Sequence, residues 1–130
     1  MLITGADGFI GAHLAAELVA RGARVFAAVR NISHTWRLDT IRSQISMLEG
    51  DLTHIEDARI IIEQSKPDII FNTASTTNTS RSLDVLESVV ENTYGILHAT
   101  ITAAHEKKVP RFIQFGSIEE YGLAKAPFTE

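Results

Sequence analysis

The sequence contains no cysteine and no hydrophobic run long enough to cross a membrane. Without cysteine the chain forms no disulfide, no thiol nucleophile and no cysteine-ligated zinc site, and it suits a reducing compartment. A membrane-spanning helix needs about 20 consecutive apolar residues, and the first residues lack the basic and apolar segments of a signal peptide. We therefore expect a cytoplasmic protein with no membrane partner.

Basic residues are also few, because twelve lysines and arginines stand against sixteen aspartates and glutamates. The net charge of −4 provides no positive surface for nucleic acid. Trp36 and the phenylalanines are not interleaved with basic residues, as they would be in a surface that stacks bases. The histidines show no metal-ligand spacing: His13, His34, His54, His98 and His105. We expect neither a nucleic-acid partner nor a bound metal ion.

The chain has 130 residues, of which 45% are hydrophobic, which is enough for one domain with a buried core. Short apolar runs alternate with longer amphipathic segments, a pattern typical of a parallel sheet whose strands are joined by helices. We expect strands at 2–4, 25–29, 45–48, 68–71 and 111–115, and helices at 9–21, 53–66 and 83–107. Thr53 and Glu56 have the spacing of a capping box at the start of the second helix.

A spaced-glycine motif, Thr-Gly-Ala-Asp-Gly-Phe-Ile-Gly, occupies residues 4–11 between the first expected strand and the first expected helix. Gly5 allows a tight turn, Gly8 lets the backbone approach a pyrophosphate, and Gly11 lets the helix pack closely on the strand. Phosphates would then face amide donors at the positive end of the helix. The alternative is a glycine-rich turn without a ligand. The motif predicts a doubly wound α/β Rossmann fold of about five strands.

With four further motifs, the chain resembles the extended short-chain dehydrogenase/reductase family, the NAD-dependent sugar-nucleotide epimerases, dehydratases and reductases. The motifs follow at the expected spacing: Gly-Asp-Leu at 50–52, Asn-Thr-Ala-Ser at 72–75, Asn-Thr-Tyr-Gly at 92–95 and Gly-Ser-Ile-Glu-Glu-Tyr-Gly at 116–122. The resemblance covers essentially all 130 residues. None of these motifs identifies the sugar, or distinguishes an epimerase from a dehydratase or a reductase.

The resemblance implies several contacts with a nicotinamide dinucleotide. Asp51 would accept a hydrogen bond from the adenine amino group, the Leu52 backbone would help to read the ring, and Ala74 would be a small residue against the cofactor. The family usually has His-x-Ala-Ala at 72–75, so Ser75 departs from its pattern. The predicted cofactor-binding residues are Gly5, Gly8, Phe9, Ile10, Gly11, Arg30, Asp51, Leu52, Ala74 and Asn92.

The end of the second strand indicates which dinucleotide is bound, NADP or NAD. An acidic residue there binds the ribose hydroxyls of NAD, whereas a cation accommodates the extra phosphate of NADP. This position holds the neutral Val29, and Arg30 follows it. A planar guanidinium suits phosphate binding, so the sequence favours NADP, with Arg37 as a second candidate cation. The alternative is that Arg30 is an ordinary solvated residue at a strand end.

The resemblance also implies catalytic residues. Ser117 occupies the position of the family's serine or threonine, which hydrogen-bonds the substrate oxygen that gains or loses a hydride. Glu119 is a candidate general base, although with Glu120 it has the alternative of an exposed turn carboxylate. The usual neighbouring acid is replaced by Ile118, which is more similar to the reductases acting on 4-keto-6-deoxy sugar nucleotides and to some epimerases.

The family's catalytic Tyr-x-x-x-Lys pair lies on a helix well after the serine. Tyr121 and Lys125 have this spacing, but Gly122 and Pro127 oppose a helix, so we expect the true pair beyond residue 130. Residues 1–130 would then be an incomplete dinucleotide-binding domain, truncated before the last strands and the substrate domain. We expect no turnover by this chain alone.

The expected function is that of the NAD(P)-binding portion of an enzyme that transfers hydride between nicotinamide and a carbon of a sugar nucleotide. Two alternatives stay open: a non-catalytic NAD(P)-binding sensor of the same fold, and a fragment that binds nothing. The resemblance also leaves a homodimer open, because the family often dimerises through the long helix, here residues 83–107, together with the next helix, which would lie beyond residue 130.

Overall fold

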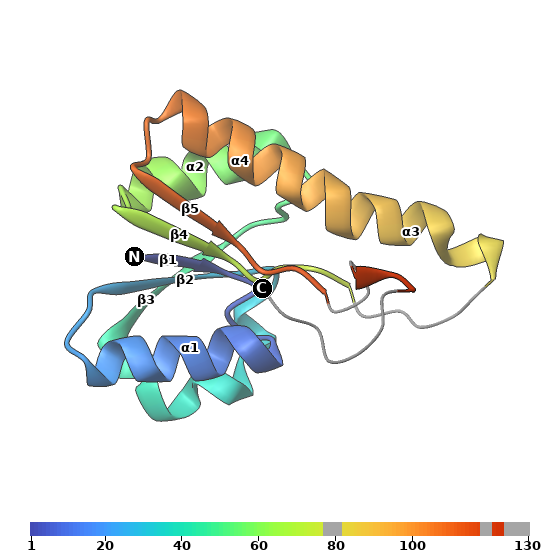
Figure 1. Cartoon of the computed structure of the whole chain (residues 1–130). Coiled ribbons are helices and arrows are strands. Elements are labelled where there is room, and N and C mark those ends of the chain that lie inside the picture. Colours follow the sequence, from blue (N-terminus) through green and yellow to red (C-terminus); the bar gives the residue numbers. More distant parts are fainter. Residues whose placement is uncertain (77–81, 118–120, 124–130) are drawn as a thin grey trace.

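The structure is a computed structural model that describes residues 1–76, 82–117 and 121–123. A five-stranded parallel sheet with the order β3-β2-β1-β4-β5 crosses the molecule (Figure 1). The strands are β1 (Leu2–Thr4), β2 (Val25–Val29), β3 (Ile45–Glu49), β4 (Ile69–Asn72) and β5 (Arg111–Gln114). The doubly wound α/β sheet predicted from the sequence is therefore confirmed, and the strand order reverses between β1 and β4, where such sheets bind ligands.

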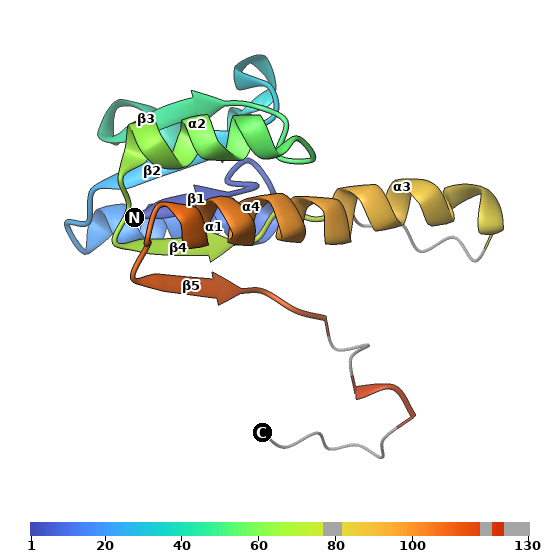
Figure 2. The same ribbon diagram turned by 90° about the horizontal axis from the view of Figure 1, so that it is seen from above.

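Helices cover both faces of the sheet. The helix α1 (Phe9–Ala20) packs with the 3₁₀ segment η2 (Trp36–Gln44) on one face, and α2 (Ile55–Ser65) packs with α4 (Ile96–Glu106) on the other (Figures 1 and 2). A shorter 3₁₀ turn, η1 (Ile32–His34), precedes η2. All residues of β1 and β2 are buried, which explains why these strands are apolar, apart from Thr4 at the end of β1, and do not alternate with polar residues.

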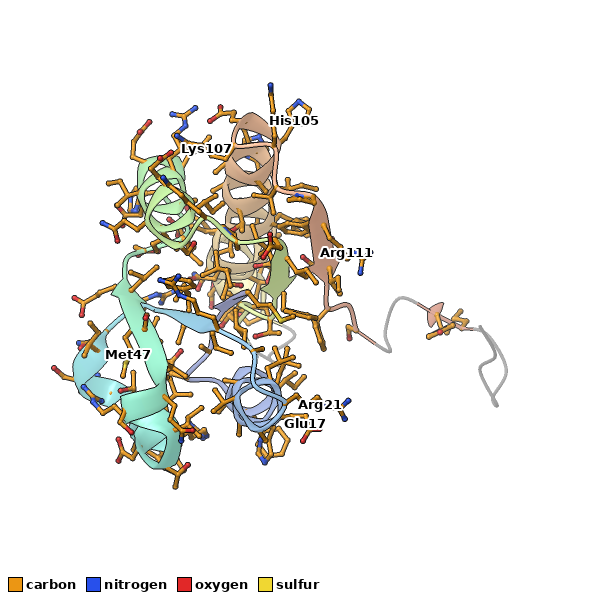
Figure 3. All side chains as sticks on the ribbon, turned by 90° about the vertical axis from the view of Figure 1, so that its left-hand side faces the viewer. Glu17, Arg21, Met47, His105, Lys107 and Arg111 are labelled. Atoms are coloured by element: carbon orange, nitrogen blue, oxygen red, sulfur yellow. The ribbon has the colours of Figure 1, made fainter. Side chains whose placement is uncertain are left out.

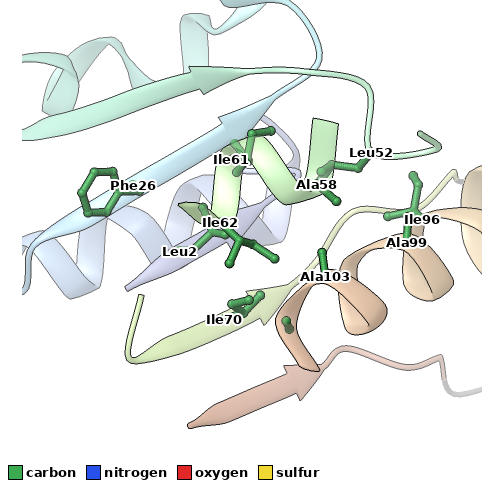
Figure 4. Packing of buried hydrophobic residues seen from close by; sticks show 12 residues of the cluster. Leu2, Phe26, Leu52, Ala58, Ile61, Ile62, Ile70, Ile96, Ala99 and Ala103 are labelled. Atoms are coloured by element: carbon green, nitrogen blue, oxygen red, sulfur yellow. The ribbon is translucent and has the colours of Figure 1, made fainter. Parts of the chain in front are cut away.

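Two clusters of buried side chains fill the spaces between the sheet and its helices. Figure 4 shows the cluster on the α2 and α4 side, where strand residues meet small and branched helix residues. Its members include Leu2, Phe26, Ile70, Ala58, Ile61, Ile62, Ile96, Ala99 and Ala103. Each fully buried aliphatic side chain stabilises the fold by about 1.5–3 kcal/mol relative to its exposed state.

Ion pairs join the outer surfaces of α2 and α4. Arg59 lies 2.7 Å from Glu106, and Lys107 lies 2.5 Å from Glu63. The Lys107 side chain extends from the end of α4 toward α2 (Figure 3). Because these pairs are largely exposed, we expect each to add at most about 1 kcal/mol to the packing of the two helices.

The sequence prediction of a capping box at the start of α2 is wrong. The N-cap residue is His54, which makes no side-chain cap, and the helix begins after it. The hydroxyl of Thr53 instead donates to Asp51 Oδ1 at 2.9 Å, and the Asp51 amide donates to Asp57 Oδ2 at 2.7 Å. Asp51 lies two residues before Thr53 and competes successfully for its polar groups, as aspartates in turns do.

The long helix expected over residues 83–107 is a succession of helical types. It comprises η3 (Leu83–Val85), α3 (Leu86–Val90), η4 (Glu91–Gly95) and α4, in which η4 is a single π-helical stretch. Figure 2 shows that α3 continues the line of α4 past the end of the sheet. Single π turns inside helices frequently occur at functional sites. No helix in the part of the chain that the structure describes is long and apolar enough to span a bilayer.

Candidate functional site

A cleft of about 430 Å³ opens at the carboxyl edge of the sheet, next to the reversal of strand order. The turn after β1, the ends of β2 and β3, the loop after β4 and the long helix all contribute to it. Six of the predicted cofactor-binding residues line this cleft: Gly5, Gly8, Arg30, Leu52, Ala74 and Asn92. The fold thus brings together residues that are spread over most of the chain.

The glycine turn after β1 has the geometry that the sequence predicted. Gly5 has a φ of +61°, and a Cβ there would lie 2.8 Å from the Cα of Ala74. A Cβ at Gly11 would overlap the Gly5 carbonyl oxygen and lie 2.9 Å from Thr73 Oγ1. At Gly8 a Cβ would meet only the Gly5 oxygen, at 3.1 Å. Gly5 and Gly11 are therefore needed for packing, while Gly8 faces the cleft.

The amino end of α1 lies directly after Gly8. No side chain caps this end, and the first turn contains no acidic residue. The first amides of a helix lack internal partners and carry the positive end of the helix dipole, which makes this end suitable for an anion. Phe9 and Ile10 stand here with exposed side chains, and neither lines the cleft. Phe9 and Ile10 could therefore contact a cofactor in the cleft through their backbone amides rather than through their side chains.

Two guanidinium groups lie at the cleft. Arg30 follows β2, and its Nη2 donates to Asn92 Oδ1 at 2.8 Å. Arg37 stacks over the Trp36 ring at 4.3 Å and donates to the Asp7 carbonyl oxygen at 3.4 Å. Both arginines line the cleft, so its wall beyond β2 is cationic.

Asp51 and Leu52 follow β3. Leu52 is buried and lines the cleft, whereas Asp51 lies beside it and is half-buried. Partial burial raises the pKa of Asp51, but hydrogen bonds from the amide and hydroxyl of Thr53, with the charges of Arg30 and His54, hold that pKa below its ordinary value. At neutral pH Asp51 is therefore a charged acceptor beside the cleft.

A buried polar cluster at the ends of β1 and β4 was missed by the sequence analysis. Thr4 is 0% exposed and Asn72 is 1% exposed, and the Thr4 hydroxyl donates to Asn72 Oδ1. The Thr73 hydroxyl donates to the Thr4 carbonyl oxygen at 2.6 Å. A polar residue at the carboxyl end of each of two apolar strand segments, 2–4 and 69–72, is the signal that could have revealed this cluster.

Comparison with known proteins identifies the family. The family description "NAD dependent epimerase/dehydratase family" matches residues 1–130. The chain belongs to this family.

Curated relatives of the chain act on sugar nucleotides, according to their names. It is 28% identical to dTDP-D-glucose 4,6-dehydratase of Homo sapiens over 94% of the chain and 37% of that protein. It is 30% identical to UDP-N-acetyl-alpha-D-glucosaminuronate decarboxylase of Bacillus cytotoxicus over 99% of the chain and 40% of that protein. The chain thus spans about two fifths of the length of these relatives.

Solved structures share the fold. UDP-glucose 4-epimerase from Bifidobacterium longum, in complex with NAD+ and UDP, superimposes with a TM-score of 0.87 at 20% identity, over 99% of this chain and 40% of that chain. The Brucella ovis UDP-glucose 4-epimerase in complex with NAD superimposes with a TM-score of 0.84 at 20% identity, over 99% of this chain and 39% of that chain. At 20% identity these superpositions show that the folds are similar and nothing more.

The predicted catalytic residues lie at the far end of the described chain. Ser117 is exposed three residues after the end of β5, and it is not among the residues that line the cleft. Glu119 and Lys125 lie outside the described residues. Tyr121 is described, but Lys125, four residues later in the Tyr-x-x-x-Lys spacing, is not. Across residues 1–76, 82–117 and 121–123, no cluster of His, Asp or Glu could hold a metal ion.

Proposed function

We propose that this chain binds a nicotinamide dinucleotide in the cleft at the carboxyl edge of the sheet. The observation that carries the proposal is the glycine turn at Gly5 and Gly8, which opens this cleft beside the uncapped amino end of α1. A turn of this kind, placed at the reversal of strand order, accommodates a pyrophosphate. Membership of the NAD dependent epimerase/dehydratase family supports the same ligand.

The residues of the chain suit separate parts of the dinucleotide. The backbone at Gly8, Phe9 and Ile10 would hold the pyrophosphate, and Gly11 would keep α1 close enough to do so. Asp51 and the Leu52 backbone would contact the adenine.

Two further residues complete the proposed cofactor site. Ala74 and Asn92 would contact the cofactor from the other side of the cleft, because both line it. The bound nicotinamide supplies a hydride acceptor or donor.

We further propose that NADP binds at least as well as NAD. The position that would carry an acidic residue in an NAD site holds Val29, which is buried and neutral. Arg30 and Arg37 instead bring two cations to the cleft. A 2′-phosphate would gain charge-assisted hydrogen bonds from these guanidinium groups, while the ribose hydroxyls of NAD would not replace them.

The whole enzyme would transfer hydride between the nicotinamide and a carbon of a sugar nucleotide. Curated relatives named for dTDP-glucose, GDP-mannose and UDP-sugar substrates support this substrate class. Ser117 would hydrogen-bond the reacting oxygen and Glu119 would act as general base, two roles that rest on the family resemblance. Residues 1–130 would be the cofactor-binding domain, and the lack of cysteine is compatible with a reducing compartment such as the cytoplasm.

A homodimer through the long helix is a further part of the proposal. An apolar series on η3, α3, η4 and α4 is exposed: Leu83, Leu86, Val90, Tyr94 and Ile101. Such a series on one long helix indicates an interface rather than a solvated surface. Light scattering of a longer protein that carries this chain and the following helix should show a dimer, and Leu86→Arg should shift the mass to that of a monomer; a monomeric parent would contradict the homodimer.

Calorimetric titration of the chain with NADP+ and with NAD+ tests cofactor binding. We expect saturable binding of both, with NADP+ at least as tight. Absence of binding by either dinucleotide would overturn the proposal and favour a fragment that binds nothing. Turnover of sugar nucleotides by a longer protein that carries this chain would distinguish an enzyme from a sensor.

A further inference from the structure

A line of polar side chains crosses the carboxyl ends of three adjacent strands. Thr4 ends β1, Asn72 ends β4 and Gln114 ends β5. The sheet register pairs Thr4 with Asn72, and Asn72 with Gln114. Their hydrogen bonds connect the side chains laterally across the sheet. The line begins at the cleft and ends just before Ser117.

The hydrogen bonds along this line all point the same way. The Ala74 amide donates to Thr4 Oγ1 at 3.3 Å, and the Thr4 hydroxyl donates to Asn72 Oδ1. Asn72 Nδ2 donates to Gln114 Oε1 at 2.7 Å, and Gln114 Nε2 donates to the Phe115 carbonyl oxygen at 2.7 Å. A backbone donor at one end and a backbone acceptor at the other allow only this direction if every amide and hydroxyl is to be satisfied.

The central members have no alternative partners in water. Thr4 is 0% exposed and Asn72 is 1% exposed, so a displaced neighbour would leave a buried polar atom unsatisfied, which is costly. Hydrogen bonds in such a chain also polarise one another. Between Ala74 and Gln114, solvent therefore cannot compensate for a shift of the Ala74 amide, and the shift reaches the exposed side chain of Gln114.

We propose that Asn72 and Gln114 are positioning residues, which couple the loop at Ala74 to the Phe115 carbonyl and so to the Gly116 and Ser117 segment. The inference rests on the proposed function, in which the dinucleotide contacts Ala74 and Ser117 contacts the reacting oxygen. Binding of the cofactor in the cleft then fixes the position of the segment that carries Ser117. Asn72 stands where the family resemblance places a histidine, so this amide line is a feature of the present sequence.

Two substitutions interrupt the line and two serve as controls. Gln114→Glu keeps the acceptor for Asn72 and removes the donor to Phe115, at an exposed residue where folding is not at risk. Thr4→Val keeps the shape of a buried side chain and removes its hydroxyl, whereas Thr4→Ser retains the hydroxyl. Gln64→Glu makes the same change of charge on the exposed surface of α2.

The test is nitrogen-15 NMR of the chain. The Gly116 amide nitrogen shares a peptide plane with the Phe115 carbonyl, so its chemical shift reports the hydrogen bond to that oxygen. Without cofactor, Gln114→Glu and Thr4→Val should move the Gly116 signal, while Thr4→Ser and Gln64→Glu should leave it in place. Saturation with NADP+ should move the Gly116 signal of the parent chain, and this response should disappear in Gln114→Glu and Thr4→Val although both still bind.

The possible failures are distinct. If NADP+ and NAD+ cause no saturable change anywhere in the spectrum of the parent chain, the proposed function is wrong. If the signals of Gly5 and Ala74 respond to the dinucleotide but Gly116 does not, the coupling is wrong. An equal Gly116 response in the parent and in Gln114→Glu would contradict it as well, and this exposed variant decides the matter if Thr4→Val fails to fold.

Discussion

Arg30 and Asn92 meet at the cleft, where a guanidinium nitrogen lies 2.8 Å from the side-chain oxygen of the asparagine. Asn92 lies on η4, and its side-chain Nδ2 donates to the Ser88 carbonyl oxygen at 2.9 Å. The asparagine is thus held by its helix and presents its oxygen to Arg30. This contact holds the guanidinium at the cleft before any ligand is bound.

Replacing Arg30 by alanine should weaken the binding of NADP+ more than that of NAD+. The loss should be about 1–3 kcal/mol for NADP+, because hydrogen bonds to a charged phosphate oxygen disappear. Calorimetry on both dinucleotides measures the difference. Arg21→Ala is the matched control, since Arg21 pairs with Glu17 on the outer surface of α1 (Figure 3). Equal losses for the two cofactors would contradict the 2′-phosphate assignment.

Gly8→Val should abolish dinucleotide binding and leave the fold largely intact. A Cβ at Gly8 meets only one backbone oxygen, at 3.1 Å, but the larger side chain would occupy the space where the pyrophosphate approaches. Calorimetry and circular dichroism measure the two effects. Normal binding by this variant would show that the turn does not hold the phosphates.

Gly11→Ala should act differently, by destabilising the protein itself. Its Cβ would overlap the Gly5 carbonyl oxygen and lie 2.9 Å from the Cα of Ala6, and both are backbone atoms, which cannot turn away as the end of a flexible side chain can. We expect a loss of about 1–3 kcal/mol in the free energy of unfolding, typical of an overpacked site. Gly22→Asn is the control, since Gly22 has a φ of +78° with open space around it and asparagine tolerates that conformation. Urea denaturation compares the two; equal stability would refute the packing role of Gly11.

Asp51 should contribute to the pH dependence of stability. Its pKa is lower in the folded chain than in the unfolded one, so the folded state gains stability when the carboxylate is charged. This contribution is complete above the unfolded pKa of about 3.9 and is lost as the pH falls below it toward the folded pKa. Asp51→Asn should therefore lose less stability than the parent between neutral pH and that acidic range. Urea denaturation at several pH values across this range measures both proteins. A steeper loss of stability in the variant than in the parent would contradict the prediction.

In a longer enzyme that carries this chain, Ser117→Ala should reduce turnover far more than Tyr121→Phe. The serine would contact the reacting oxygen, whereas Gly122, directly after Tyr121, has a φ of +57°, which is not a right-handed helical conformation. Steady-state rates with sugar nucleotides measure both variants. If Tyr121→Phe is the more damaging change, or if the 130-residue chain turns over substrate alone, the assignment of Tyr121 is wrong.

The sequence by itself predicted what depends on neighbours along the chain. The strands followed from short, mainly apolar segments, and the glycine turn followed from spacings that only glycine tolerates, as the φ of +61° at Gly5 and the close packing at Gly11 demonstrate. The start of α2 was predicted wrongly because two local interactions competed for Thr53, and Asp51 displaced the expected cap. Spacing alone does not rank such competitors.

Only the tertiary structure decided which distant residues share the cleft. Arg30 and Asn92 are 62 positions apart, and Thr4 and Asn72 are 68 positions apart. Parallel strands must be joined by crossover helices, so Thr4 and Asn72, which are adjacent in the sheet, are remote in the sequence, and so are Arg30 after β2 and Asn92 on a helix that covers the sheet. The order β3-β2-β1-β4-β5 placed β4 beside β1, and that placement brought Ala74 onto Gly5 and Asn72 onto Thr4. A periodic pattern specifies that a segment is a strand, but the strand it pairs with is selected by packing across the whole sheet.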